Sequence, residues 1–292
     1  MKIVICLLLI IISQACTAKT LTLEMHEKAE ERGLVCNDGS PGGYYVHYEN
    51  GSNLWLFFQQ GGGWCYDIAS CTERIILPIT VGITNDLISS KTWPSQRNIH
   101  GLFDLLAHFN LVYIPYCSSD AHMADTEKTI LLQKVHFRGR RLAFDTITRL
   151  IGSKSNQLVI FGGLSAGGRG SMVTIDALRP LLPASTTLIG LHDSGNYVDL
   201  PPLDPFYDPF LTQCQRAYET YNSPPISPNC QAFFAADPWK CLCGAFMLPL
   251  LQTPSQVIIH QFDSYQLYHD LRRRDPENWK SEDCQYANYQ FR

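Results

Sequence analysis

The chain has 292 residues, of which 45% are hydrophobic and 17% charged, and its formal net charge at pH 7 is −4. This length and apolar content are enough to bury a sizeable core, in one large domain or two small ones. A slightly acidic chain without a run of basic residues lacks the electrostatic footprint of nucleic-acid binding, so we expect no nucleic-acid partner.

The first 18 residues have the anatomy of a secretory signal peptide. Lys2 precedes an apolar stretch at 3–12, and small residues follow up to Ala18. An apolar stretch of about ten residues is short for a membrane span, which needs ~20. We therefore expect residues 1–18 to be removed, the protein to be secreted, and residues 19–292 to form its one domain, with no membrane span.

In a secreted protein, most cysteines are expected to form disulfides. The sequence has 11 cysteines, and two of them lie in the leader, so the mature chain has an odd number that should mostly form disulfides. Cys65 and Cys71 are candidates for a small disulfide. A metal pair is the alternative, but no His/Cys set with zinc spacing completes one, so we expect no metal site. Asn50 begins an Asn-Gly-Ser sequon, which predicts glycosylation there.

Apolar runs along the chain predict an α/β fold. They are continuous rather than alternating, as expected for parallel strands covered on both faces, and they lie at 53–59, 110–116, 157–163, 186–192 and 256–262. The apolar spacing at 137–152 suits an amphipathic helix. We therefore expect a mostly parallel sheet with helices on both faces. Proline and cysteine cluster at 200–254, which predicts a loop-rich insertion braced by disulfides.

A single serine stands among small residues directly after the third apolar run. Residues 163–167, Gly-Leu-Ser-Ala-Gly, match the G-x-S-x-G nucleophile elbow, in which a strained strand-to-helix turn exposes the serine. Ser165 would be the nucleophile, and the Ala166 amide would face the developing oxyanion. Gly62 and Gly63, after the first run, are candidates for the other oxyanion amides. A glycine-rich bend with no catalytic role is the alternative.

The partners of Ser165 are harder to assign. Asp263 follows the last apolar run, where this architecture places the triad acid, although it could equally be a helix cap. His269 is the only histidine after Asp263, and six residues is too close for the usual arrangement. His192 and His122 are further possibilities, but each is easier to read as structural. The serine thus has a plausible acid and no convincing base.

Several stretches together resemble the pectinacetylesterase/Notum family of secreted α/β-hydrolase-fold carboxylesterases. They include CNDGSPGGYYV (36–46), LFFQQGGGWCYDIASC (56–71), YIPYCSSD (113–120), GLSAGGRGS (163–171) and VIIHQFDSYQL (257–267). The resemblance implies an α/β-hydrolase fold and assigns Ser165 and Asp263 to the triad, and Gly62, Gly63 and Ala166 to the oxyanion hole. It implies no cofactor.

The same resemblance implies that the family's catalytic histidine is not in this sequence. The family's catalytic histidine lies well downstream of the triad acid, in a segment that would follow Arg292, so the C-terminal part of the fold is expected to be missing. The hypothesis is a truncated gene model or a shortened, inactive member that acts as a non-catalytic secreted binding protein. The expected substrate is an acylated polysaccharide, carrying acetyl groups, or an acylated secreted protein, carrying a fatty acyl group.

Overall fold

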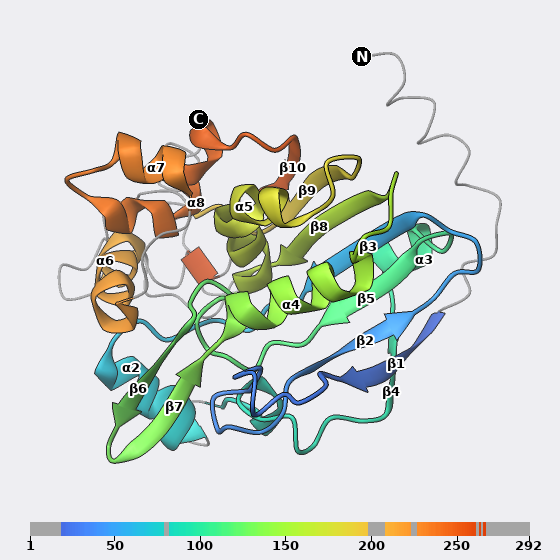
Figure 1. The fold of residues 1–292 in the computed structure, drawn as a ribbon. Helices are drawn as coiled ribbons and strands as arrows, with labels where there is room; N and C mark the ends of the chain where they lie inside the picture. Colours follow the sequence, from blue (N-terminus) through green and yellow to red (C-terminus); the bar gives the residue numbers. More distant parts are fainter. Residues whose placement is uncertain are drawn as a thin grey trace, which may run out of the picture.

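The computed structural model describes residues 19–78, 82–197, 208–222, 227–260, 263 and 265–266. Its centre is an eight-stranded sheet in the order β10-β9-β8-β3-β5-β2-β1-β4 (Figure 1). The strands are β1 (Lys19–Met25), β2 (Gly43–His47), β3 (Leu54–Gln59), β4 (Gln96–Ile99), β5 (Asn110–Ile114), β8 (Leu158–Leu164), β9 (Thr187–Asp193) and β10 (Ser255–Ile258).

The parallel part of the sheet confirms the expectation from the apolar runs. β3 pairs in parallel with β5 and β8, and β9 pairs in parallel with β8 and β10. Each of these five strands falls on one of the five predicted runs. The antiparallel part, β2, β1 and β4, was not predicted, and it extends the sheet beyond β5.

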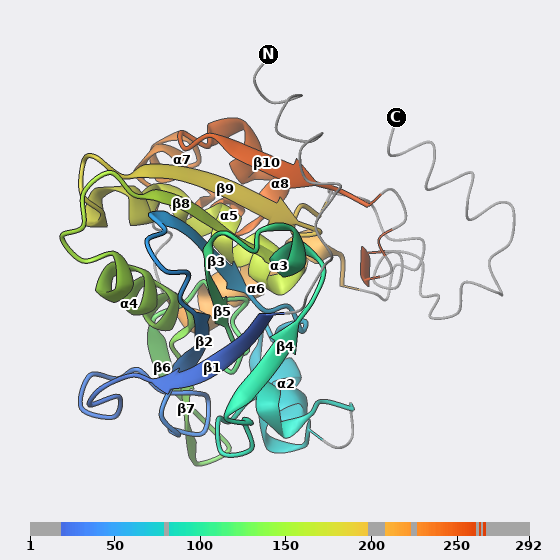
Figure 2. The same cartoon turned by 90° about the vertical axis from the view of Figure 1, so that its right-hand side faces the viewer.

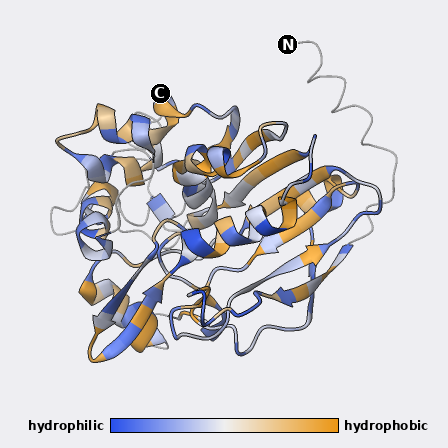
Figure 3. Cartoon of the chain, viewed as in Figure 1, coloured by the Kyte–Doolittle hydropathy of each residue, from blue (hydrophilic) through white to orange (hydrophobic). Residues whose placement is uncertain are grey.

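Side chains of the central strands alternate between two hydrophobic layers. Phe57 packs on the face covered by α4 (Gly139–Ile151) and α5 (Ala166–Leu178), whereas Phe58 packs on the opposite face against Phe103 of α3 (Leu102–Leu105). Figure 2 shows α4 and α3 on opposite sides of the sheet. Helices therefore lie on both faces, as predicted. Hydrophobic residues concentrate on the central strands (Figure 3).

The expected insertion is braced by disulfides but is more helical than predicted. Its described part contains α6 (Phe210–Tyr221), α7 (Pro228–Phe233), α8 (Gly244–Met247) and two 3-10 turns, η6 (Pro238–Leu242) and η7 (Leu248–Leu250). Disulfides join Cys214 to Cys243 and Cys230 to Cys241. The prediction of a loop-rich segment was wrong for α6, whose residues 210, 214, 217 and 221 are buried at helical spacing.

The remaining elements lie around the sheet. β6 (Thr126–Ile130) and β7 (Gln133–Phe137) form a separate two-stranded antiparallel ribbon. Short helical segments follow the first parallel strand and precede β4: α2 (Ile68–Cys71), η2 (Thr72–Ile76) and η4 (Asn85–Leu87); a further turn, η5 (Arg179–Leu181), follows α5. Within the described ranges no helix is both long and apolar enough to cross a bilayer. The predicted signal peptide lies outside the described residues.

Every described cysteine takes part in a disulfide. Besides the two pairs in the insertion, Cys36 bonds to Cys117, and Cys65 bonds to Cys71 across the small loop where the sequence predicted a disulfide. Cys284 lies outside the described residues. Asn50 is exposed in the turn between β2 and β3.

Candidate active site

Ser165 occupies a strained turn between β8 and α5. Its backbone angles are φ 55° and ψ −118°, a positive φ that non-glycine residues rarely adopt. The turn is held on both sides, since the Ser165 amide donates to the Asp193 carbonyl of β9 at 2.8 Å and its carbonyl accepts from the Arg169 amide at 2.9 Å. The strand, sharp turn and helix form the geometry of a nucleophile elbow.

Three glycines let the strand and the helix approach so closely. A Cβ at Gly163 would lie 2.8 Å from the Gln59 carbonyl oxygen, one at Gly167 would collide with the same oxygen, and one at Gly168 would collide with the Asp193 carbonyl. The two neighbouring strands, β3 and β9, therefore fix the helix above Ser165. This packing explains why small residues surround the serine in the sequence.

The glycine loop after β3 runs directly against the elbow. A Cβ at Gly61 would lie 3.0 Å from the Cβ of Ser165. Gly62 and Gly63 have φ angles of 144° and 67°, which favour glycine. The buried Arg74 side chain holds this loop, because its Nη2 donates to the Gly62 carbonyl at 2.7 Å and its Nε donates to Ser119 Oγ at 3.0 Å.

Two of the three residues expected to form an oxyanion hole lie at one cavity with Ser165, whereas Gly62 does not line it. Gly63, Ser165 and Ala166 line the same small cavity. Ala166 is the first residue of α5, so its amide has no carbonyl one turn earlier to receive it. In the described part of the chain, neither Gly62 nor Gly63 donates its amide to a backbone carbonyl.

The cavity at Ser165 is small and mostly aromatic. Its volume is about 10 Å³, room for roughly one water molecule. Its remaining lining residues are Trp64, Arg169, Tyr197 and Tyr265. The Ser165 hydroxyl lies 3.3 Å from the hydroxyl of Tyr197, and Tyr197 packs against Tyr265 with ring centroids 5.5 Å apart. Sequence reasoning did not single out these aromatic residues.

Asp263 does not line this cavity, and among the described residues no hydrogen bond joins it to Ser165. Its Oδ1 accepts the Gln266 amide at 2.8 Å, as a helix cap does. Burial raises the pKa of Asp263, and the nearby His260 opposes that shift. The charge of Asp263 in turn contributes to raising the pKa of Tyr197, after the larger effect of burial. Asp263 is therefore close to the residue that contacts the serine.

The two histidines weighed as bases among the described residues face elsewhere. His192 is fully buried, with Nδ1 2.8 Å from Ser171 Oγ and Nε2 3.2 Å from Ser255 Oγ. His122 is buried with its Nε2 3.0 Å from the Gln60 carbonyl. Burial lowers the pKa of each to about 4. Both are structural, and His269 lies outside the described residues.

One further histidine stands at the end of β10. His260 is exposed, and its Nε2 lies 3.6 Å from Asp193 Oδ1. It does not line the cavity at Ser165. Across the described ranges, no histidine is hydrogen-bonded to Ser165, and no group of three or more His, Cys, Asp or Glu side chains is placed to hold a metal ion.

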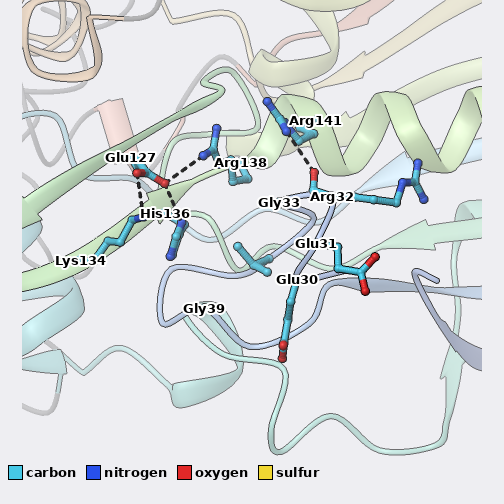
Figure 4. A pocket seen from close by; sticks show the side chains of 11 residues that line it. Glu30, Glu31, Arg32, Gly33, Gly39, Glu127, Lys134, His136, Arg138 and Arg141 are labelled. Carbon is cyan, nitrogen blue, oxygen red and sulfur yellow. Dashed lines mark hydrogen bonds and ion pairs between the residues drawn. The ribbon is translucent and has the colours of Figure 1, made fainter. Parts of the chain in front are cut away.

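A larger cleft of about 510 Å³ lies apart from Ser165 and shares no residue with its cavity. It is formed by the loop after β1, the ribbon β6–β7 and the start of α4 (Figure 4). Most of its charged side chains are paired, some within the cleft and others with residues outside it. Glu127 bonds to Lys134 and Arg138, and Arg141 donates to the Arg32 carbonyl. No group in it resembles an activated nucleophile.

Comparison with known proteins agrees with this geometry. The sequence model of the family described as pectinacetylesterase matches residues 14–291. Palmitoleoyl-protein carboxylesterase NOTUM of Schmidtea mediterranea is 31% identical over 255 residues, covering 80% of this chain and 47% of the relative. The mouse protein of the same name is 30% identical over 254 residues, covering 80% of this chain and 49% of the relative. The chain thus spans about half the length of these curated relatives.

The solved structures extend the likeness to the fold. The Wnt deacylase Notum from Drosophila superposes with a TM-score of 0.80 at 25% identity, covering 93% of this chain and 80% of that chain. The match includes the mixed, mostly parallel sheet predicted for an α/β-hydrolase-like fold. Since the family model covers nearly the whole sequence, the chain belongs to the pectinacetylesterase family.

Proposed function

We propose that this protein is a secreted serine carboxylesterase that hydrolyses O-acyl esters through an acyl-enzyme. One observation carries the proposal: Ser165 stands on a strained elbow at the end of a central strand, against the glycine loop 61–63. Such an elbow exposes a serine hydroxyl next to backbone amides, which is the arrangement that acyl transfer needs. Family membership supports the same chemistry.

In the proposed mechanism Ser165 Oγ attacks the ester carbonyl carbon and loses its proton to a base. The amides of Gly62, Gly63 and Ala166 stabilise the tetrahedral oxyanion, which collapses to an acyl-enzyme as the alcohol leaves with that proton. Water then attacks the acyl group and releases the carboxylic acid. Asp263 is the proposed acid that orients the base, a histidine that the described residues do not supply. No cofactor takes part in these steps.

The names of the relatives suggest two substrate classes. The family is described as pectinacetylesterase, and its curated relatives as palmitoleoyl-protein carboxylesterases. The proposed substrate is accordingly an acetylated polysaccharide or a fatty-acylated secreted protein. The exposed position of Asn50 supports its proposed glycosylation, and the disulfides support secretion.

The test is hydrolysis of p-nitrophenyl acetate and p-nitrophenyl octanoate by the purified chain and by its Ser165→Ala variant. We expect turnover of at least one ester by the parent chain and none above background by the variant. Preference for acetate would favour the polysaccharide substrate, and preference for octanoate the fatty-acylated protein. Equal rates for parent and variant would refute Ser165 as the nucleophile.

A second candidate is a secreted binding protein that keeps the fold without turnover. One observation favours it: the Ser165 hydroxyl lies 3.3 Å from the Tyr197 hydroxyl, and no described histidine is hydrogen-bonded to it. Triad members act as a unit, so the loss of the base alone removes most of the rate. This candidate predicts that an ester or its acid product binds with equal affinity to the parent chain and to Ser165→Ala, with no product formed.

A further inference from the structure

The cavity at Ser165 contains a buried positive charge that the mechanism does not use. Arg169 lies one helical turn after Ser165 on α5, lines the same cavity and is only 1% exposed. Its guanidinium carbon lies 3.7 Å from the centre of the Trp64 ring and 5.1 Å from that of Phe210. The aromatic faces stabilise the charge, but they leave its N–H groups without acceptors.

Among the described residues the guanidinium has no acceptor. Nε and Nη2 of Arg169 are buried without a hydrogen bond, and no described carboxylate forms an ion pair with it. Tyr197 and Tyr265 line the cavity beside it but offer no negative charge at neutral pH, because burial raises the pKa of each above its ordinary value. A buried charge without a partner is costly, so such groups are normally paired or hydrogen-bonded.

Arg74 provides a comparison within the same loop region. It is also buried, at 5% exposure, yet its Nε and Nη2 donate to Ser119 Oγ and to the Gly62 carbonyl. Arg74 is therefore a satisfied structural residue. Arg169 is buried still more deeply, at 1% exposure, without those bonds, and it lines the cavity at Ser165.

We propose that Arg169 is a specificity-determining residue that binds a carboxylate group of the substrate next to the scissile ester. This inference rests on the proposed ester hydrolysis at Ser165. A guanidinium fork pairs with a carboxylate through two parallel hydrogen bonds, which would satisfy the donors that the described residues leave without acceptors. A neutral alkyl chain would leave them unsatisfied. The carboxylate belongs either to the acyl group or to the alcohol, and the experiment separates these sources.

The acyl arm compares mono-p-nitrophenyl glutarate with p-nitrophenyl valerate, which has the same chain length without the charge, after subtraction of uncatalysed hydrolysis. The alcohol arm measures acetate release from O-acetyl galacturonic acid and from its methyl ester. We expect the parent chain to prefer the anionic member of one pair in kcat/KM. Arg169→Gln should reduce that preference about tenfold or more, as expected for losing hydrogen bonds to a charged group.

Two controls protect the result against misfolding. Arg169→Lys keeps the charge without the fork and should retain part of the preference, while Arg149→Gln, on α4 and paired with Glu27 at the surface, should leave it unchanged. Thermal unfolding of Arg169→Gln should show at most a small change in stability, because removing a buried charge without a hydrogen-bonded partner offsets the loss of its contacts with the Trp64 and Phe210 rings. A large loss of stability with no change in preference would instead make Arg169 a structural residue.

A binding measurement keeps this inference separate from the proposed catalysis. Glutarate and galacturonic acid are titrated by calorimetry into Ser165→Ala, with and without Arg169→Gln. Binding of one of them that is lost with Arg169→Gln supports the carboxylate site even if no ester is hydrolysed. No binding of either acid, together with equal preference in both kinetic arms before and after Arg169→Gln, would overturn it.

Discussion

The two halves of the candidate site are built very differently. The half that holds Ser165 lies on the central strands β8 and β3, where the elbow hydrogen-bonds to β9 and glycines allow backbone contact on both sides. The half that holds Asp263 follows β10, at the end of the sheet order, where Asp263 accepts backbone hydrogen bonds from Gln266 and Tyr265 and acts electrostatically on Tyr197.

The two halves differ in how closely the backbone is packed around the functional residue. Around Ser165 the backbone itself sets the geometry, because carbonyls of β3 and β9 would meet a Cβ at three glycines. Around Asp263 the geometry is set by its side chain, which accepts the Gln266 amide. The central half is therefore expected to be rigid and intolerant of substitution, whereas the role of the edge half depends on the base that Asp263 is proposed to orient.

The largest expected effect is at the centre. Ser165→Ala removes the proposed nucleophile and should lower kcat for a p-nitrophenyl ester by roughly a millionfold, to the background rate, as removal of a serine nucleophile does in well-studied triads. Steady-state kinetics measures it. The exposed serine variant Ser155→Ala is the matched control and should keep the parent rate; retained activity in Ser165→Ala would contradict the assignment.

A smaller loss is expected at the edge. Asp263→Asn keeps the shape of the side chain but removes its charge, and the acid of a triad orients the base rather than reacting. We expect kcat to fall by about ten-thousandfold, with thermal stability nearly unchanged. An activity equal to that of the parent chain would remove Asp263 from the proposed triad and leave it as the helix cap seen at Gln266.

Acidification should weaken the whole molecule through its buried histidines. The folded pKa values of His122 and His192 are about 4 against an ordinary 6.5, so the unfolded state binds more protons and stability falls as pH drops from 6.5 to 4. Each contributes about 3 kcal/mol over that range. Asp120, whose pKa burial raises to about 6, gains a proton on folding and offsets about one of them.

Urea unfolding between pH 7 and pH 4.5 measures this dependence. His192→Asn should flatten the curve, because that side chain no longer titrates in either state, while the exposed His108→Asn should leave it unchanged. Stability that rises on acidification over this range would contradict the burial of the two histidines as neutral groups.

The smallest effect sharpens the packing argument at the centre. Gly167→Ala places a Cβ against the Gln59 carbonyl of β3 and should destabilise the protein by about 3 kcal/mol, the upper end for overpacked sites, because backbone atoms cannot move aside. Gly51→Ala is the control, because the space around Gly51 is open although its φ is 73°, so it should cost only about 1 kcal/mol. Equal costs at both positions would contradict a tightly packed elbow.

The parallel core was predictable because buried parallel strands are continuous apolar runs. β1 was missed although Leu21, Leu23 and Met25 alternate with polar residues, because a criterion of continuous apolar runs does not detect a half-buried strand. β4 was not predictable, since it has four residues and Ile99 is its one apolar side chain. The ribbon β6–β7 carries no turn signal either. Its turn places Leu131 and Leu132 at φ 45° and 67°, where local rules expect Asn or Gly, so tertiary structure decides that turn.

The residues of the site that belong to local backbone motifs were predictable from the sequence. Ser165, Ala166 and the glycine loop 61–63 come together because a strand-turn-helix motif and a glycine run have strong local signals. Tyr197, Tyr265 and Arg169 come from separate positions and are joined only by the fold. Arg169 stands out in the sequence as a charged residue inside a run of small residues, one turn after the serine. That position alone does not predict that its side chain is buried beside Ser165.

Covalent labelling of Ser165 tests the central claim most directly. The purified chain is incubated with a fluorophosphonate, digested and mapped by peptide mass spectrometry, with the Ser165→Ala variant beside it. We predict one phosphonylated peptide, with the adduct on Ser165, and no labelling of the variant. An unlabelled Ser165, or an adduct confined to another residue, would contradict the proposal that this elbow carries an activated nucleophile.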